Sequence, residues 1–177
     1  MTNQPFHLRL AEADDVPQIV SLMGGTWEKF LSSSLPRSDI QHQLDTRLSH
    51  ATISSDYAKP TDFFLVISPS DTPREIVGVA QLSPSPHKAK FSGAKTIELK
   101  WLFVHGDYQG KGLSKTLMVA SQEKAKELGC DSIWLIVWEE NVKGIEIYQK
   151  MGYEKKGETD YVIGETTRNL WVLEKML

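Results

Sequence analysis

Apolar side chains along this chain follow two periods, one of two residues and one of three to four. Residues 7–11 alternate between apolar and polar positions, which predicts a first strand. The acidic stretch 12–15 offers a helix cap, Pro17 suits a first helical turn, and the apolar residues within 19–23 predict one helical face. We expect the glycine pair 24–25 to end this helix.

Two more helical segments are expected before the next strand. Apolar residues within 27–31 indicate one or two further turns, and Pro36 interrupts them. The segment 38–48 again places apolar residues at helical spacing. Residues 51–60 are expected to form a loop.

The remaining chain alternates strands and helices. Strands are predicted at 63–67, 75–82, 97–104 and 132–138, and within 153–163 and 169–175. Helices are predicted at 113–128, closed by Gly129, and from Asn141 to about residue 150, closed by Gly152. Because no linker is long enough to divide the chain, we expect one domain over residues 1–177, a sheet flanked by helices in a three-layer α/β/α arrangement.

Composition narrows the classes of function. A chain of 177 residues with 40% hydrophobic and 24% charged residues is typical of a globular protein. The formal net charge of −3, with no long basic run, argues against nucleic acid as a partner. Residues 1–7 lack the pattern of a secretory leader, and no stretch approaches a membrane span, so we expect no membrane association and a cytoplasmic location.

Neither a disulfide nor a metal site is expected. Cys130 is the single cysteine of the chain, which excludes an internal disulfide and a cysteine-rich metal site. Four histidines show no metal-ligand spacing and are expected at the surface; they are His42, His50, His87 and His105.

A glycine-rich segment joins the predicted strand 97–104 to the following helix. Residues 109–114 read Gln-Gly-Lys-Gly-Leu-Ser and enter the helix directly. Unpaired N–H groups at a helix start, together with glycines that allow close approach, favour an anion such as phosphate. A tight turn that uses glycine only for its geometry is the alternative. The pattern is not a Walker loop, because Gly112 follows Lys111, nor a dinucleotide fingerprint, because Lys115 stands at its third glycine.

The loop does match another pattern. Gln109-x-x-Gly112-x-Ser114 resembles the acetyl-coenzyme A loop of the GCN5-related N-acetyltransferases (GNAT), Gln/Arg-x-x-Gly-x-Gly/Ala, with serine as a small departure. The segment from Asn141 to Tyr153 is similar to the same family's Asn-x-x-Ala-x-x-x-Tyr-x-x-x-Gly-Phe. There a glycine replaces the alanine and a tyrosine replaces the phenylalanine. The two segments stand at the expected separation, with a predicted strand between them.

The resemblance extends from about Ile76 to the C-terminus, and the ending from Tyr161 to Leu177 is similar to the PaiA-type polyamine N-acetyltransferases. It implies a mixed, mostly antiparallel central sheet of six to seven strands. It also implies that acetyl-CoA is the cosubstrate, without a metal, and that the acetyl group passes by direct attack within a ternary complex to a primary amine. The residues implied to contact coenzyme A are Leu102, Phe103, Val104, Gln109, Gly110, Lys111, Gly112, Leu113, Ser114, Asn141 and Tyr148.

These cofactor roles differ along the chain. The loop 109–114 would surround the pyrophosphate, mainly through backbone N–H groups. The backbone of residues 102–104 would pair with the pantetheine amides as an added strand does. Asn141 would hold the pantetheine or phosphate end, and a plain helix cap is the alternative or additional role.

Glu98 is the candidate general base. An alkylammonium has a pKa of about 10.4, so only ~1 in 10³ is neutral near pH 7, and a proton acceptor helps it to attack. Glu98 lies eleven residues before Gln109, the offset of the base in well-studied family members. Strand alternation predicts that it shares a face with Lys100, Leu102 and Val104, opposite Ile97, Leu99, Trp101 and Phe103. The alternative is a carboxylate that is solvated or paired with Lys100, in which case a water relay or another carboxylate is the base.

Tyr148 is the candidate general acid, because the resemblance places the family's acid there and a phenol stays protonated at neutral pH. A core aromatic in register with Ile145 is the alternative. The acceptor stays open: a small amine such as a polyamine is expected, and a protein lysine or N-terminus is the alternative. A non-catalytic acyl-CoA-binding regulator is the third possibility. A monomer or a homodimer is expected.

Overall fold

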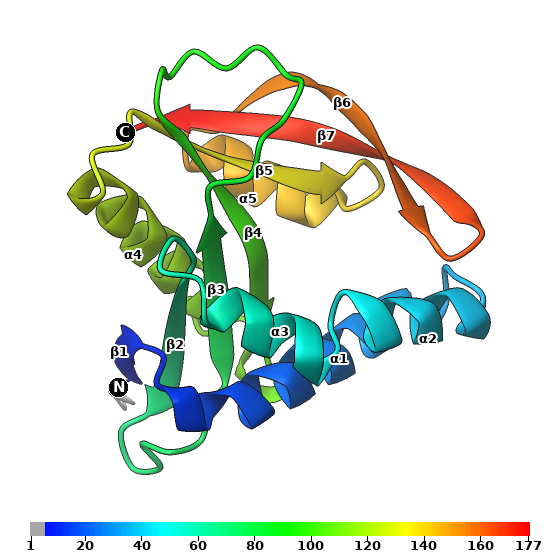
Figure 1. The fold of residues 1–177 in the computed structure, drawn as a ribbon, viewed down its shortest axis with the longest axis vertical. Helices are drawn as coiled ribbons and strands as arrows, with labels where there is room; N and C mark the ends of the chain where they lie inside the picture. The colour runs from blue at the N-terminus through cyan, green and yellow to red at the C-terminus, as the bar shows by residue number, and fades with distance from the viewer. Residues whose placement is uncertain (1–5) are drawn as a thin grey trace.

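The computed structural model describes residues 6–177 and folds seven strands into one sheet (Figure 1). The strands are β1 Phe6–Leu10, β2 Phe63–Pro69, β3 Gly78–Ser83, β4 Thr96–Val104, β5 Ser132–Trp138, β6 Glu154–Ile163 and β7 Thr166–Met176. Their order is β1-β2-β3-β4-β5-β7-β6, and all neighbours are antiparallel except β4 and β5, which are parallel. The expected mixed, mostly antiparallel sheet is confirmed.

Residues 6–177 form five α-helices, and four of them cover the two faces of the sheet (Figure 1). They are α1 Val16–Leu31, α2 Arg37–Thr46, α3 His50–Tyr57, α4 Leu113–Glu127 and α5 Val142–Lys150, with short 3-10 turns at η1 Ala13–Asp15 and η2 Gly106–Tyr108. Helices α1 and α3 pack on one face, and α4 and α5 pack on the other. The expected three-layer arrangement is therefore confirmed. None of the helices within residues 6–177 is long and apolar enough to cross a membrane.

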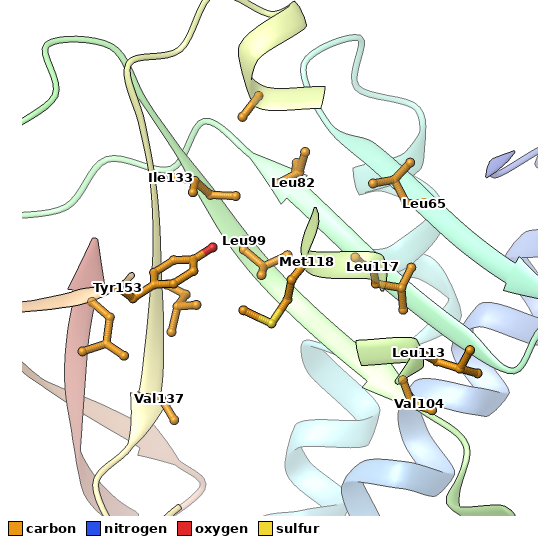
Figure 2. Packing of buried hydrophobic residues seen from close by; sticks show 14 of the residues in the cluster. Leu65, Leu82, Leu99, Val104, Leu113, Leu117, Met118, Ile133, Val137 and Tyr153 are labelled. Carbon is orange, nitrogen blue, oxygen red and sulfur yellow. The ribbon is translucent and has the colours of Figure 1, made fainter. Parts of the chain in front are cut away.

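Helix α4 fills the centre of one core. Its buried side chains Leu113, Leu117 and Met118 contact β2, β3 and β4, and Tyr153 closes the cluster beside β5 (Figure 2). Burial of large aliphatic side chains of this kind contributes about 1.5–3 kcal/mol each. This core fixes the start of α4, and with it the glycine-rich loop, against the end of β4.

Helix α1 continues through Gly24 and Gly25, contrary to the expectation that they end it. Glycine costs a helix only about 1 kcal/mol relative to alanine. Met23 and Leu31 are both buried on the same stripe of the helix, and their burial outweighs that cost. A Cβ at Gly24 would stand 3.4 Å from the Leu44 side chain on α2, an ordinary van der Waals contact, so packing against α2 does not require glycine there.

The expectation of a loop at residues 51–60 was also wrong, because α3 occupies most of this segment. Ser49 caps this helix by accepting a hydrogen bond from the Thr52 N–H, and Ile53 is fully buried against α1. A capping serine and one well-placed isoleucine suffice for a two-turn helix once tertiary packing supports it. Strand β3 begins at Gly78, later than the expected residue 75.

Strand β4 carries a bulge that the alternating pattern missed. Gln81 and Leu82 are neighbours on β3, yet their partners on β4 are Trp101 and Leu99, so Lys100 is an extra residue. A bulge of this kind shifts the alternation by one position. The side chains beyond it change faces.

The predicted grouping of the β4 side chains was therefore wrong. The α4 face holds Ile97, Leu99, Leu102 and Val104. The α1 face holds Trp101 and Phe103. Glu98 lies between Ile97 and Leu99, so it points to the α1 face, on the side of Trp101 rather than of Leu102.

Helix α2 is tied to the tip of the β6–β7 hairpin. Asp39 accepts hydrogen bonds from the Glu165 N–H and the Thr166 hydroxyl. Gly164 has a positive φ of 58°, and a Cβ there would collide with Asp39, so only glycine fits this approach. These contacts hold α2 and the hairpin together at one end of the sheet.

His87 is half-buried, which corrects the surface assignment made for it. Its ring lies 5.0 Å from that of Trp134 and 6.1 Å from that of Phe91, where the loop between β3 and β4 folds over the sheet. Burial lowers the pKa of His87. His42, His50 and His105 are exposed, and residues 6–177 contain no cluster of three acidic, histidine or cysteine side chains suited to a metal.

Candidate active site

The sheet opens where β4 and β5 separate. These parallel strands pair only through Thr96, Ile97 and Glu98 on the β4 side, and beyond that point they diverge. A cavity of about 1110 Å³ occupies the opening and is bounded by α1 on one side of the sheet and by α4 and α5 on the other. The volume exceeds that of most small-ligand pockets and fits a site for two molecules.

The open edges of both strands line this cavity. Leu102, Phe103 and Val104 pair with β3 on one edge, so their opposite edge faces the opening. Sequence reasoning missed the matching edge of β5, where residues 135–138 line the other side. The run of apolar residues in β5 indicated a buried strand, and nothing local in it marked an unpaired edge.

The glycine-rich loop closes one end of the opening. Gln109 and Ser114 line the cavity, and Gln109 donates a hydrogen bond from Nε2 to the Val104 carbonyl, 3.2 Å away. That bond fixes the loop to the end of β4. It also shows that the Gln109 side chain has a structural role in addition to any contact with a ligand.

Both loop glycines adopt the left-handed conformation that favours glycine. The φ angles of Gly110 and Gly112 are 76° and 82°, and a Cβ at either would find no heavy atom within 4 Å. Gly112 is the N-cap of α4, where unpaired N–H groups and the positive helix end favour an anion. Free space beside such amides fits the pyrophosphate of coenzyme A.

Four loop residues do not line the cavity themselves, namely Gly110, Lys111, Gly112 and Leu113. The Lys111 ammonium lies 4.6 Å from the centre of the Tyr108 ring, outside the opening. Leu113 is buried in the α4 core, so its side chain serves packing. Any contribution of Leu113 to an anion comes from its backbone N–H.

Helix α5 brings two predicted residues to the same cavity, Asn141 and Tyr148. The Asn141 side chain accepts a hydrogen bond from the Gly144 N–H at 3.0 Å, which confirms the expected helix cap. Tyr148 packs edge-on against Tyr153, with ring centres 5.8 Å apart. Burial raises the pKa of Tyr148 to about 12, so its hydroxyl stays a proton donor at neutral pH.

Glu98 lines the cavity from the other face of the sheet. Its side chain is 7% exposed, and burial raises its pKa above the usual 4.5. A hydrogen bond with Ser85 and the charge of Lys100 oppose that rise, and the charge of Asp62 adds to it. A carboxylate with a raised pKa is a better proton acceptor than a solvated one.

The structure does not form the alternative ion pair between Glu98 and Lys100, because Lys100 pairs with another carboxylate. The Lys100 ammonium donates to Asp56 on α3, 2.7 Å away. Asp56 also accepts from Lys59 and from the fully buried Gln81, which donates to Asp62 as well. Within residues 6–177, Lys100 therefore pairs with Asp56 and Glu98 makes no ion pair.

Sequence reasoning missed the aromatic and cationic half of the cavity. On the α1 face it is walled by Trp27, Phe30, Trp101, Trp138 and Tyr161, with Arg47 and Arg168 beside them. Trp27 packs edge-on against Trp101, and Phe30 against Trp138. The aromatic content of α1 was visible in the sequence, but its juxtaposition with the β6–β7 hairpin depends on the tertiary fold.

Comparison with known proteins identifies the family of this chain. The family model "Acetyltransferase (GNAT) family" matches residues 26–153. An uncharacterized N-acetyltransferase in the pepI 3' region of Lactobacillus delbrueckii subsp. lactis is 22% identical over 163 residues, 92% of each chain. The spermine/spermidine N(1)-acetyltransferase of Bacillus subtilis (strain 168) is 32% identical over 88 residues, 49% of this chain and 58% of that protein.

A solved structure shares the fold. The PaiA N-acetyltransferase from Thermoplasma acidophilum, crystallised in complex with coenzyme A, superposes with a TM-score of 0.77 at 19% identity and covers 98% of this chain and 99% of its own. The family model matches well over half of the chain, so this protein belongs to the acetyltransferase (GNAT) family and is an acetyl-CoA-dependent N-acetyltransferase.

Proposed function

We propose that this chain, acting as one catalytic domain, transfers an acetyl group from acetyl-CoA to the primary amine of a small molecule by direct attack. The observation that carries the proposal is that a buried carboxylate and a half-buried phenol line one cavity, Glu98 from β4 and Tyr148 from α5. Acetyl-CoA supplies the activated acetyl thioester. The two side chains supply the proton transfers that the exchange of sulfur for nitrogen requires.

Glu98 acts as the proton acceptor. An amine enters solution as an ammonium and must lose a proton before its nitrogen can form the new C–N bond. Burial raises the pKa of Glu98, so its carboxylate accepts that proton more readily than a solvated one would. Because Glu98 points to the α1 face, the acceptor amine approaches from the aromatic side of the cavity.

Tyr148 acts as the proton donor. The C–S bond breaks as the C–N bond forms, and the departing sulfur needs a proton or a hydrogen bond. The Tyr148 hydroxyl stands on the α5 side of the opening and remains protonated, with a pKa of about 12. The two protons are thus handled from opposite faces of the sheet, and the thioester lies between them.

The open edge of residues 102–104 pairs with the pantetheine amides, and the loop 109–114 binds the pyrophosphate through its amides. Asn141 adds a contact at the pantetheine end while it caps α5. The free space at Gly110 and Gly112 and the unpaired edge of β4 support these assignments. A pantetheine that pairs with β4 as a strand would also account for the gap between β4 and β5, where the sheet has no further strand.

The relatives favour a small acceptor. The Bacillus subtilis relative acts on spermine and spermidine by its name, and this makes a polyamine the first candidate to test. The mixed wall of aromatic and charged side chains fits a small amine that lies within the cavity.

An amine-panel assay tests the proposed function. Free thiol release from acetyl-CoA is followed with a panel of primary amines, and N-acetylated product is identified by mass spectrometry. We expect amine-dependent release that falls in Glu98→Gln and Tyr148→Phe. Protein that binds acetyl-CoA by calorimetry but releases no thiol with any amine would instead be a non-catalytic acyl-CoA-binding regulator.

A further inference from the structure

The charges around the cavity are unbalanced. Among the described residues that line it, Glu98 is the one carboxylate, whereas four side chains carry a positive charge: Lys29, Arg47, Lys100 and Arg168. A polyamine carries several positive charges, and a site for it would need several carboxylates. This lining instead favours a ligand that carries negative charge.

Two of the four cations have other roles within the fold. Lys100 is neutralised by Asp56 at 2.7 Å. Lys29 lies beside Gly106, where a Cβ would be 3.2 Å from its ammonium, so it stands near the glycine-rich loop that holds the cofactor. Arg47 and Arg168 remain.

Arg47 and Arg168 flank the same aromatic side chain. Tyr161 and Arg168 are directly opposite each other on β6 and β7, and the Arg47 guanidinium lies 4.6 Å from the centre of the Tyr161 ring. Arg168 itself lies 5.1 Å from the centre of the Trp138 ring. The two guanidiniums therefore gather at the α2 and β6–β7 end of the cavity.

Neither guanidinium has a carboxylate partner within residues 6–177. One Arg168 nitrogen donates to the Ser34 carbonyl at 2.7 Å, which holds its side chain in place. Its Nε–H is buried and makes no hydrogen bond to the described chain. A guanidinium presents paired N–H groups that match the two oxygens of a carboxylate.

The carboxylate and the guanidiniums share one half of the cavity. Glu98 points to the α1 face, and its charge acts on Tyr161, the ring that both arginines flank. A molecule bound here meets a base and an anion site together, with aromatic walls around its body. A ligand with an amine beside Glu98 and an anionic group beside the two arginines would match both the base and the anion site.

We propose, building on the function proposed above, that the acceptor is a small primary amine that also carries a carboxylate, which Arg47 and Arg168 bind while the amine faces Glu98. The amine is the group that is acetylated. The carboxylate holds the acceptor in place and takes no part in the bond changes. A second ammonium in its place would be repelled by two guanidiniums that have no carboxylate partner among the described residues.

Matched pairs of acceptors test this directly. Each pair consists of an amino acid and the amine that remains when its carboxylate is removed: phenylalanine with 2-phenylethylamine, methionine with 3-methylthiopropylamine, and ornithine with 1,4-diaminobutane. Thiol release is measured over a range of each acceptor at saturating acetyl-CoA. We expect kcat/KM to be about ten- to hundredfold higher for the carboxylate-bearing member, since a hydrogen bond to a charged group is worth one to two factors of ten.

Variants at the two arginines localise the effect. Arg47→Gln and Arg168→Gln should raise KM for the carboxylate-bearing acceptor by about tenfold or more, leave KM for acetyl-CoA unchanged, and reduce the preference within each pair. Arg47→Lys should restore part of the preference. Arg37→Gln is the matched control, because Arg37 begins α2, the helix that Arg47 caps at its C-terminal end, and the exposed Arg37 side chain lies outside the cavity.

The outcomes separate this proposal from the proposed function. A preference for 1,4-diaminobutane over ornithine, or unchanged kinetics in both arginine variants, would contradict the proposal that the acceptor carries a carboxylate. The proposed acetyl transfer to an amine would be unaffected. If no acceptor releases thiol, calorimetry with coenzyme A-loaded protein decides. If the amino acids bind and their binding weakens in Arg47→Gln, the anion site is supported and the proposed acetyl transfer is contradicted. If the two members of each pair bind equally, both the anion site and the proposed acetyl transfer are contradicted.

Discussion

Glu98 and Tyr148 line one cavity although they approach it from opposite faces of the sheet. Glu98 points toward α1 because its neighbours on β4 pack under α4, whereas Tyr148 belongs to α5 and packs against the α4 core. The separation of β4 and β5 makes this possible, since an intact sheet would keep the two side chains apart. A proton can therefore leave on one face while another is delivered on the other.

The first prediction concerns Glu98. Glu98→Gln should lower the rate most near pH 7 and less near about pH 9–10, where more of the amine is already neutral. The wild-type rate should also fall on the acid side at a pH above the usual carboxyl pKa of 4.5, because burial raises the pKa of Glu98. Steady-state pH profiles of both forms measure this.

Glu140→Gln serves as the control, because Glu140 is an exposed carboxylate at the end of β5 that does not line the cavity. It should leave the profile unchanged. A Glu98→Gln profile that keeps the wild-type shape and is only displaced downward would show that Glu98 is not the base.

The second prediction concerns Tyr148. Tyr148→Phe keeps the ring and its edge-on packing on Tyr153, so the fold and KM for acetyl-CoA should change little. Loss of a general acid is worth about 10²–10⁴ in rate, and we expect kcat to fall by that factor. Rapid-quench measurement of a single turnover separates this step from product release.

Tyr153→Phe is the matched control on the adjacent ring. Tyr153 is buried beside Tyr148 and does not line the cavity. Its removal should leave kcat within a few-fold of wild type. A Tyr148→Phe enzyme that turns over equally well would assign Tyr148 to packing alone.

The third prediction concerns the glycine-rich loop. Gly112→Glu should abolish acetyl-CoA binding, because it places a negative charge where the amides at the start of α4 face an anion. Gly112→Ala separates charge from backbone strain. Its methyl group meets no atom within 4 Å, but its φ of 82° costs about 1–2 kcal/mol in a residue with a Cβ.

Calorimetry with acetyl-CoA and a thermal melt of each variant distinguish the two effects. We expect Gly112→Ala to lower the melting temperature and to retain binding, and Gly112→Glu to fold and lose it. If a folded Gly112→Glu protein binds acetyl-CoA with wild-type affinity, the pyrophosphate does not bind at this loop.

Those features of the site that rest on local sequence could be predicted. The glycine-rich loop at 109–114 and the Asn141 cap are set within a few residues, and the structure has the cap as expected and a positive φ at Gly110 and Gly112. The succession of strands and helices along the chain from β4 to β7 follows from hydrophobic patterns with clear turn residues between them.

The acceptor half could not be predicted, because it depends on contacts between distant segments. Gln43 donates to Tyr161 across 118 positions of sequence, and this contact places Arg47 beside the β6–β7 hairpin. The bulge at Lys100 is equally hidden, since its cause lies in the pairing with β3 and not in the residues of β4. Without that bulge, alternation assigns Trp101 to the wrong face.

The last prediction concerns Asp56, which holds Lys100 away from Glu98. Burial alone would raise the pKa of Asp56, but hydrogen bonds from Lys100, Lys59 and Gln81 outweigh it and lower the pKa to about 2. A carboxyl whose pKa is lower in the folded state stabilises the fold above its unfolded value of 3.8, and that stability is lost as the pH falls toward 2. Asp56→Asn should cost about 1.5–3 kcal/mol at pH 7, the usual worth of hydrogen bonds to a charged group.

Urea unfolding at several pH values tests this dependence on Asp56. The difference in unfolding free energy between wild type and Asp56→Asn should be largest at neutral pH and should shrink between about pH 4 and pH 2, because protonation removes in the wild type the charge that the variant lacks. Asp160→Asn is the control, since Asp160 is exposed and makes no side-chain hydrogen bond or ion pair within residues 6–177, and its difference should stay near zero throughout. A difference for Asp56→Asn that does not change with pH would mean that the amide disturbs packing around Gln81, and that the charge of Asp56 adds nothing to stability.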